Sequence, residues 1–341
     1  MGHRRKPAPV RPRRTPARRA SGLLLRAIGW TSAVCGVAWA QEAPPNAAPN
    51  QWFTGSLEAP SPALPIAGMV AVEPYVVLQP NTGYYADDGA KHSVTNDTTI
   101  LETLVVFKYG LTNRLTFEAL PAFSHGWAAQ TAPGATKFGD LPVELEYRLT
   151  DTNYHNGAPS VTLDLGVTAP TGAYDHLESA LDGVGTGAWL LKQGVVAQSL
   201  FDTWNNHPVR LRAWAQIFEP LDNPSVRGTS VYGTSTGFNG SATPGISSQF
   251  GVAGGYALDQ RWVLALDLVD TYNDSFRLRG TTGSGVALRS QGTSGNSLAL
   301  APAVEYNWSA DAGVICGIEF SAAGRNTPAY IAPQVAVAVS F

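Results

Sequence analysis

Cysteine is almost absent from this chain, which has two cysteines, Cys35 and Cys316, among its 341 residues. Cys35 lies in an amino-terminal segment that we expect to be removed, so the remaining chain cannot form an intramolecular disulfide. Cys316 stands among apolar residues, and a lone cysteine in that setting is typical of a small packing residue rather than a nucleophile. No histidine or cysteine pair has the spacing of metal ligands, so we predict neither a metal site nor a cofactor.

The sequence also lacks an apolar run that is long enough to form a transmembrane helix. The apolar stretch at residues 27–38 is too short to span a bilayer. It follows basic residues with no acidic residue among them, and Ala38 and Ala40 occupy the positions that a signal peptidase reads. These features predict a secretory signal peptide over residues 1–40. Twin-arginine export is less favoured, because the paired arginines lie away from the apolar run.

Charge is sparse and becomes one-sided once residues 1–40 are removed. These residues hold nine of the 23 Lys and Arg, which leaves 14 against 26 Asp and Glu and a net charge near −12. So acidic a chain is not expected to bind nucleic acid. The mean hydropathy is −0.06, which a sheet that faces lipid only at every second residue can have.

The chain does contain a repeated alternation of apolar and polar residues. In the last segment Ile331, Val335 and Phe341 share one face, while Gln334 and Ser340 share the other. This period of two predicts strands with one face toward lipid and one toward water. We therefore predict an all-β fold, a transmembrane antiparallel up-and-down β-barrel over residues 68–341. Its twelve strands are expected at residues 68–79, 98–109, 114–123, 139–150, 160–170, 186–200, 208–219, 246–257, 261–272, 296–307, 312–322 and 329–341.

The connections between these segments are sorted by length. Those after every second strand are compact, whereas most of the others are long and rich in Gly, Ser, Thr and Asn, above all residues 221–245 and 273–295. A soluble β-sandwich gives no reason for this sorting, which is typical of periplasmic turns and extracellular loops. An even strand count places both termini in the periplasm. Residues 41–67, rich in Pro and Ala, are expected to be a flexible periplasmic lead-in.

Apolar and aromatic residues predict how the barrel would sit in a membrane. The outward positions expected on three strands are Leu141, Val143, Leu145 and Tyr147, then Val161, Leu163, Leu165 and Val167, then Trp262, Leu264, Leu266 and Leu268. Tyr and Trp prefer the membrane boundary, where the ring is in an apolar region and the OH or NH meets water. The aromatics expected at the periplasmic boundary are Tyr109, Tyr147, Tyr256, Trp262, Tyr306, Trp308 and Phe341.

Ionisable residues fall on the opposite, inward face of the strands. Arg210 and Arg212, with Lys192 on the preceding strand, are expected to form a basic strip. An acidic group with one arginine is expected on neighbouring strands. The candidate ligand-binding residues are Lys192, Arg210, Arg212, Glu102, Glu118, Glu144, Glu146, Arg148, Asp164 and Asp267. A charge facing lipid is costly, so any barrel directs its ionisable side chains inward whether or not they bind a ligand. The favoured alternative is therefore that these side chains pair with one another as a structural network.

A lipid-hydrolysing barrel would need a Ser and a His placed on strands toward the membrane. The histidines after residue 40 are all expected in loops or turns: His92, His125, His155, His176 and His207. We therefore predict that the protein is not an enzyme.

A series of short motifs resembles the outer-membrane family named after the meta-pathway of phenol degradation. The motifs are Trp52-Phe53-Thr54-Gly55, Ala59-Pro60-Ser61-Pro62, Glu73-Pro74-Tyr75, Tyr109-Gly110-Leu111-Thr112-Asn113-Arg114-Leu115, Phe138-Gly139-Asp140-Leu141 and Pro170-Thr171-Gly172. The resemblance implies an outer-membrane barrel that admits aromatic or hydrophobic compounds. It implies no functional residues.

The favoured function is an outer-membrane barrel that passes or binds small molecules, including aromatic or hydrophobic ones. Its expected partners are outer-membrane lipid, a small solute and, through the terminal Phe341, the barrel-assembly machinery. One alternative is a non-conducting structural barrel or a surface-interaction barrel whose long loops bind a partner. The third is an outer-membrane lipid hydrolase.

Overall fold

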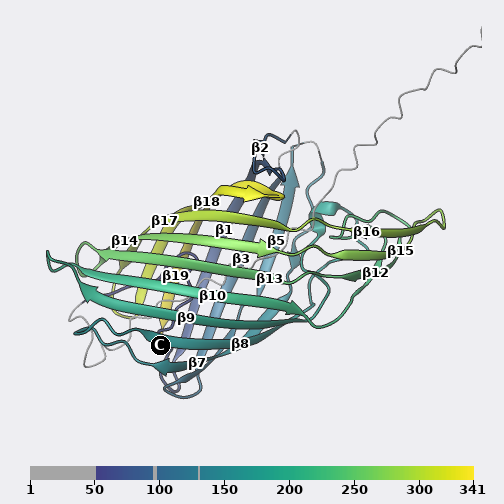
Figure 1. Cartoon of the computed structure of the whole chain (residues 1–341). Helices are drawn as coiled ribbons and strands as arrows, with labels where there is room; N and C mark the ends of the chain where they lie inside the picture. Colours follow the sequence, from purple (N-terminus) through teal and green to yellow (C-terminus); the bar gives the residue numbers. More distant parts are fainter. Residues whose placement is uncertain (1–50, 95–97, 130) are drawn as a thin grey trace, which may run out of the picture.

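The structure, a computed structural model, describes residues 51–94, 98–129 and 131–341. The expected signal peptide and residues 41–50 lie outside the described residues. The described chain forms a closed antiparallel β-barrel of twelve crossings, as predicted (Figure 1). The crossings are β1 (Val70–Tyr85), β3 (Thr98–Gly110), β4 (Leu115–Ala119) together with β5 (Ala122–Ala128), β7 (Leu141–Thr150), β8 (Ser160–Ala169), β9 (Leu190–Asp202), β10 (Pro208–Pro220), β13 (Ser247–Ala257), β14 (Trp262–Asn273), β17 (Gly295–Asn307), β18 (Ala312–Arg325) and β19 (Thr327–Ser340).

The barrel closes where its first and last strands pair. β1 is paired with β3 on one side and with β19 on the other. In register, Ala71 lies opposite Lys108 of β3 and Ser340 of β19. Closure removes the open edges that a sheet cannot expose to hydrocarbon.

Helical structure is scarce in the part of the chain that the structure describes. It amounts to one turn of 3-10 helix, η1 (Ala180–Asp182). None of the described residues belongs to a helix with the length and apolarity needed to cross a membrane.

The third crossing is broken into β4 and β5 at Leu120 and Pro121. Pro121 has no N–H to donate to the sheet. Beyond this break β5 continues to pair with β3, and its other edge pairs with the short strand β6 (Lys137–Phe138). The crossing therefore extends past the predicted end at residue 123.

Two histidines expected in loops lie in strands instead. His125 is in β5, and His92 is in the two-residue strand β2 (Lys91–His92), which pairs with the end of β1. Those two predictions are wrong. The break at Pro121 interrupts the alternating pattern, so the continuation of the strand through His125 could not be recognised.

Alternating burial confirms the predicted inward and outward faces. Leu165 and Leu266 are exposed to 59% and 52% in the absence of lipid, while their neighbours Asp164 and Asp267 are buried. Every outward residue predicted on β7, β8 and β14 is exposed or half-buried. The outer wall is therefore apolar, and the polar groups face the lumen.

Aromatic side chains gather at the end of the barrel where the short connections lie, which we call the turn end; the opposite end is the loop end. Trp262 and Tyr306 lie with ring centroids 4.7 Å apart, and Trp308 is 6.1 Å from Tyr306. Phe341 is 71% exposed at the same end. This arrangement agrees with an aromatic belt at one membrane boundary.

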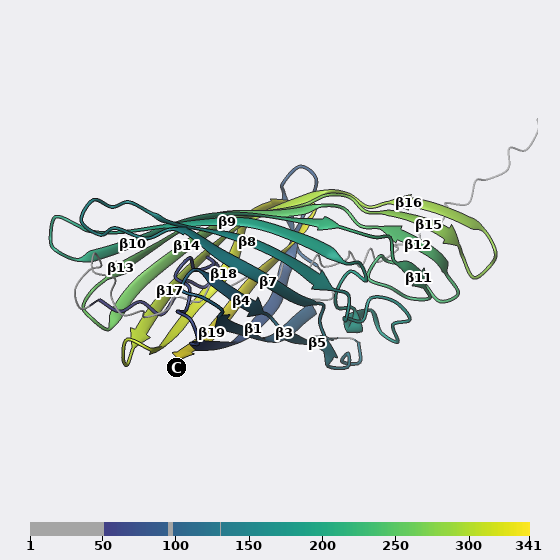
Figure 2. The same cartoon turned by 90° about the horizontal axis from the view of Figure 1, so that it is seen from below.

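The two longest loops form a second sheet, which the sequence analysis did not predict. Strands β11 (Ser225–Arg227), β12 (Asn239–Thr243), β15 (Arg277–Thr281) and β16 (Ala287–Gln291) pair in that order into a four-stranded antiparallel sheet. Figure 2 shows this loop sheet extending beyond the barrel at the loop end. It lies beyond one side of the barrel, because its strands are connected directly to β10, β13, β14 and β17.

Glycine at position 251 gives space to a large side chain inside the barrel. An added Cβ at Gly251 would overlap the indole of Trp214, whose Nε1 donates to Gln249 at 3.1 Å. Gly251→Val should therefore lower the free energy of unfolding by about 1 to 3 kcal/mol, measured by urea unfolding in detergent micelles. Gly254→Val on the same strand is the control, because the nearest atom to an added Cβ there is 3.7 Å away. Equal stability of the two variants would contradict this account of Gly251.

Candidate functional site

A segment that precedes the first strand lies inside the barrel. Every residue from 53 to 65 is buried except the half-buried Ala63, and we call residues 53–65 the luminal segment. The segment starts beside the turn end, where the Trp52 N–H donates to the Gln260 carbonyl at 3.4 Å. It returns to the same end, where the Ala67 N–H donates to Asn113 Oδ1 at 3.1 Å. The luminal segment is therefore a loop inserted through one mouth of the barrel.

Asp267 of β14 is the main acceptor for this loop. Its Oδ1 accepts a hydrogen bond from Ser56 Oγ at 2.5 Å, and its Oδ2 accepts one from the Glu58 N–H at 2.7 Å. The Ala59 N–H approaches the same Oδ2 at 3.4 Å. The hydrogen bonds from Glu58 and Ala59 give an acceptor to buried backbone N–H groups that have no strand partner.

Arg210 and Arg212 of β10, two strands away from β14 in the sheet, also hold the loop. Arg210 donates through Nη2 to the Gly55 carbonyl at 2.7 Å and to Glu305 at 2.6 Å. Its guanidinium also lies 4.6 Å from the centroid of the Phe53 ring, a cation–π arrangement. Arg212 donates to the Ala59 carbonyl at 3.2 Å.

Further side chains of the wall complete the set of anchors. Glu305 and Asn307 of β17 accept hydrogen bonds from Thr54 at 2.8 and 2.7 Å. Gln334 of β19 donates to Glu58 at 2.8 Å, and Thr162 of β8 donates to the Pro62 carbonyl at 3.2 Å. The loop thus contacts β8, β10, β14, β17 and β19, so it crosses the lumen rather than lining one wall.

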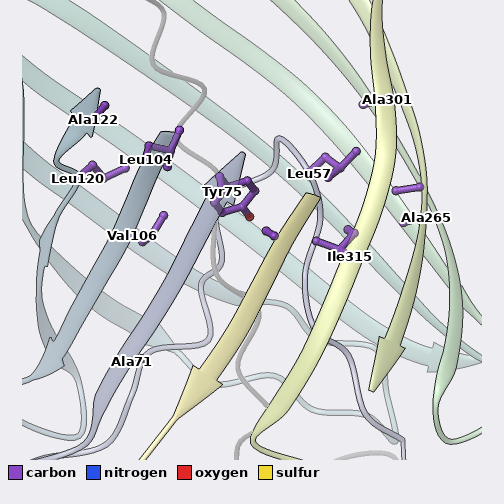
Figure 3. Packing of buried hydrophobic residues seen from close by; sticks show 12 residues of the cluster. Leu57, Ala71, Tyr75, Leu104, Val106, Leu120, Ala122, Ala265, Ala301 and Ile315 are labelled. Carbon is purple, nitrogen blue, oxygen red and sulfur yellow. The ribbon is translucent and has the colours of Figure 1, made fainter. Parts of the chain in front are cut away.

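Apolar packing adds to these polar anchors. Leu57 is fully buried in a cluster that includes Tyr75, Leu104, Val106 and Ile315 (Figure 3). The wall has no side chain at the position that Leu57 contacts, because that residue is Gly317, and an added Cβ there would overlap the leucine side chain. The other residues of this cluster are Ala71, Leu120, Ala122, Ala265, Ala301, Ala303 and Ala336.

The placement of the luminal segment differs from the flexible lead-in expected for residues 41–67. Its Pro- and Ala-rich composition does disfavour strands and helices, and the segment forms neither. The barrel nevertheless orders it, because buried carboxylates and guanidinium groups of the wall supply the hydrogen bonds that its own backbone cannot make. Glu305, Asn307, Gln334 and Thr162 are anchors that the sequence analysis did not single out as candidates. The signal available for Glu305 and Gln334 was their position on the polar face of the alternating pattern.

A second ionic group, the lysine–carboxylate cluster, lies on the wall formed by β3, β4, β7, β8 and β9. Lys108 bridges Glu118 at 2.6 Å and Glu146 at 2.7 Å, and Lys192 pairs with Glu144. Asp164 is buried beside Glu146 in the sheet register. Oxygens of the three glutamates lie within 4.8 Å of one another, a spacing that suits a cation, and the two ammonium groups provide positive charge there.

The expected basic strip of Lys192, Arg210 and Arg212 does not form. The antiparallel register places Lys192 opposite Phe218, and Arg210 and Arg212 opposite Leu200 and Gln198. Lys192 therefore joins the lysine–carboxylate cluster, which corrects the prediction.

Two other candidates belong to neither set of ion pairs. Arg148 is at the rim of the turn end, where it donates to the Asn113 carbonyl at 2.7 Å and approaches Asp151 at 3.6 Å. Glu102 is half-buried on β3. Neither side chain takes part in the hydrogen bonds that hold the luminal segment.

Loop residues at the loop end are joined to one another and to the barrel by hydrogen bonds. The Ala135 N–H donates to Asp182 of η1 at 2.6 Å, and the Gly134 N–H donates to the Gly126 carbonyl of β5 at 2.8 Å. Asp140 fixes the neighbouring loop by accepting from the Thr186 N–H at 2.7 Å and the Gly172 N–H at 2.9 Å. These hydrogen bonds hold the loops that follow β5 and β8 in fixed positions at the loop end.

The Asp267 anchor can be tested by its removal. In Asp267→Ala the Ser56 hydroxyl and the Glu58 N–H lose their buried acceptor, so the luminal segment should leave the lumen more often. We expect more frequent and larger ion-conducting openings in planar bilayers. Asp259→Ala in a turn, where the carboxylate accepts only from the backbone of Arg261 and Trp262, should conduct like the unaltered protein. Equal conductance of both variants would show that Asp267 does not hold the segment in place.

The lysine–carboxylate cluster gives a separate prediction about stability. Lys108→Met leaves Glu118 and Glu146 buried without their ammonium partner, which should cost about 3 to 5 kcal/mol of unfolding free energy. Adding Glu118→Gln and Glu146→Gln should restore most of the loss, because the unpaired charges are removed. Urea unfolding of the single and triple variants measures both effects. A triple variant no more stable than the single one would argue against charge burial as the cause.

Comparison with known proteins identifies the fold. No family model and no curated protein matches the chain. Among solved structures, the chain is similar to an outer membrane channel from Pseudomonas putida F1, with 20% identity and a TM-score of 0.58 over 82% of this chain and 97% of that one. Looser similarity, with a TM-score of 0.38 and 13% identity over 93% and 98% of the two chains, links it to a deltaS2 mutant of the TodX monoaromatic hydrocarbon channel. The Ralstonia pickettii toluene transporter TbuX is similar with a TM-score of 0.42 and 10% identity, over 81% of this chain and 90% of that one. The similarity to the Pseudomonas protein shows that this chain has the fold of an outer-membrane β-barrel.

Proposed function

We propose that the protein is an outer-membrane channel for small apolar molecules, including aromatic ones. The observation that carries the proposal is the luminal segment, which is buried inside a closed, lipid-facing barrel and reaches Asp267 at the middle of β14. A water-filled pore for polar solutes would need an unobstructed lumen. Here Lys108 and Arg210 are paired with carboxylates of the wall, Asp267 is bound to the segment, and Leu57 packs in an apolar cluster.

Apolar solutes suit such a lumen better than polar ones do. A polar molecule that enters a dry, packed interior must give up hydrogen bonds to water, which costs free energy unless new partners replace them. An apolar molecule has no such bonds to lose. The inner face near β3 and β5 offers it Leu104, Val106, Leu120 and Ala122.

The proposal includes an orientation and a route to the membrane. Residues 1–40 would be removed on export, the turn end with both termini would face the periplasm, and the loop end would face outward. The terminal Phe341 would be read by the barrel-assembly machinery. The aromatic belt and the length sorting of the loops support this orientation. The motif resemblance to the phenol meta-pathway family, and the similar fold of the Pseudomonas channel, support the transport role.

A disulfide that fixes the luminal segment provides the test. An added Cβ at Gly313 lies 3.1 Å from Thr54 Cβ, somewhat less than the ~3.8 Å typical of disulfides. We propose Thr54→Cys with Gly313→Cys in a Cys316→Ser background, so that no other thiol remains in the described chain. Cells that make the oxidised double variant should take up a radiolabelled aromatic hydrocarbon several-fold more slowly, and a mild reductant should restore the rate.

The matched control is Thr54→Cys alone in the same background, because it cannot form the crosslink. Uptake at the rate of cells that lack the protein, in the reduced and the oxidised state alike, would favour the non-conducting structural barrel. Uptake that ignores the crosslink would mean that solutes bypass the luminal segment.

A further inference from the structure

The loop sheet has one apolar and one polar face. On the apolar face, Val226, Ala242 and Leu278 are buried against Tyr232 and Phe238. The polar face carries the alternate residues of the same four strands and is exposed. The apolar face gives the sheet a core of its own, so the polar face is presented on a defined support.

Four arginines stand on this polar face, and its strands supply no carboxylate beside them. Asp175, outside the sheet, accepts a hydrogen bond from the backbone N–H of Arg227 at 3.0 Å. Arg279 and Arg289 lie directly opposite each other on β15 and β16, Arg277 is two residues from Arg279, and Arg227 is on β11. We call this set the arginine face. The four strands contain no Asp or Glu, although the chain after residue 40 is acidic overall. Among the described residues, none of these arginines takes part in an ion pair.

Like charges opposite each other on a sheet are destabilising. The Arg279 and Arg289 pair is therefore unfavourable unless something outside the sheet compensates for it. An anion bound across the two guanidinium groups would do so, because guanidinium forms paired hydrogen bonds with phosphate oxygens.

The arginine face points away from the barrel axis. On the apolar face, loop residues link the sheet to the opposite wall of the mouth. An added Cβ at Gly183 would lie 2.8 Å from Val231, and one at Gly126 of β5 would lie 3.0 Å from the Leu181 carbonyl oxygen. The apolar face is thus turned toward the mouth, and the arginines project outward.

The height of the arginine face above the membrane follows from the strand that carries it. Tyr272 and Phe250 are exposed at the loop end of the apolar wall, to 41% and 48%. Arg277 follows Tyr272 by five residues and Arg279 by seven, so they lie at most about 17 and 24 Å beyond that boundary. Residues 274–276 are not part of a strand, so these are upper limits, and the arginines lie closer to the headgroup layer than the full extension of the chain would place them.

We propose that the arginine face binds the phosphate groups of the glycolipid that forms the outer leaflet of the membrane. The proposal rests on the outward orientation of the loop end given above, and it concerns an interaction separate from solute passage. Phosphates in the headgroup layer would compensate the Arg279 and Arg289 pair and hold the loop sheet against the membrane surface.

The test uses the purified full-length barrel in detergent and bisphosphorylated lipid A as the probe, with binding measured by native mass spectrometry. Arg279→Gln with Arg289→Gln should weaken binding by about thirtyfold, the combined effect expected for two basic residues near an anionic lipid surface. Lys91→Gln with Lys137→Gln removes the same number of charges from the loop end outside the loop sheet, and it should bind lipid A like the unaltered protein. Arg279→Lys with Arg289→Lys should fall between the two, because it keeps charge but loses the paired hydrogen bonds.

Dephosphorylated lipid A should bind no more tightly to the unaltered protein than to the glutamine variant. The proposal is overturned if it binds as well as the phosphorylated form, if the two double glutamine variants bind alike, or if inorganic phosphate displaces lipid A at equal concentration. It is also overturned if the glutamine substitutions change the oligomeric state and leave lipid A binding intact, because the face would then join copies of the chain. Aromatic uptake by the glutamine variant reports separately on the channel function.

Discussion

Hydrogen bonding of the backbone in a medium without water is the constraint on which the structure depends. Hydrocarbon offers no partner to an open strand edge, so the ladder that begins at β1 must return to it through β19. Once the sheet is closed, its two faces meet different surroundings. The outer face becomes apolar, and ionisable groups are confined to an interior where they must find partners. The interior network is therefore a result of closure.

The same constraint explains why an irregular segment can lie inside the barrel. The luminal segment forms no strand, so its backbone groups depend on side chains of the wall. Asp267, Arg210 and Glu305 provide what a neighbouring strand would otherwise provide. Charges that would be costly if left unpaired are satisfied in turn by the segment. Wall and segment are thus mutually dependent, and the function that we propose requires that this arrangement can be rearranged.

The sequence was sufficient to predict the strands because lipid and water impose a period of two on every crossing, as in Leu264, Leu266 and Leu268 of β14. The sequence was insufficient to predict the loop sheet, the partners of Lys192 and the burial of residues 53–65. The loop sheet is built from short segments such as β12 (Asn239–Thr243), which places only Gly240 and Ala242 on the apolar face. These are too few apolar residues to form an alternation that could be recognised. The position of Lys192 depended on the strand register, and the burial of residues 53–65 depended on side chains far away in the chain. Neither can be read from local pattern.

The luminal segment enters and leaves by the same mouth, with Trp52 beside Gln260 and Ala67 beside Asn113. Among the residues that the structure describes, none of this segment is therefore threaded from one end of the cylinder to the other. Withdrawal or reinsertion of the segment would break none of the strand pairs, including the pairing of β1 with β19 that closes the barrel. The barrel can consequently form first and the luminal segment can enter it afterwards, because its entry does not require the chain to pass through the barrel.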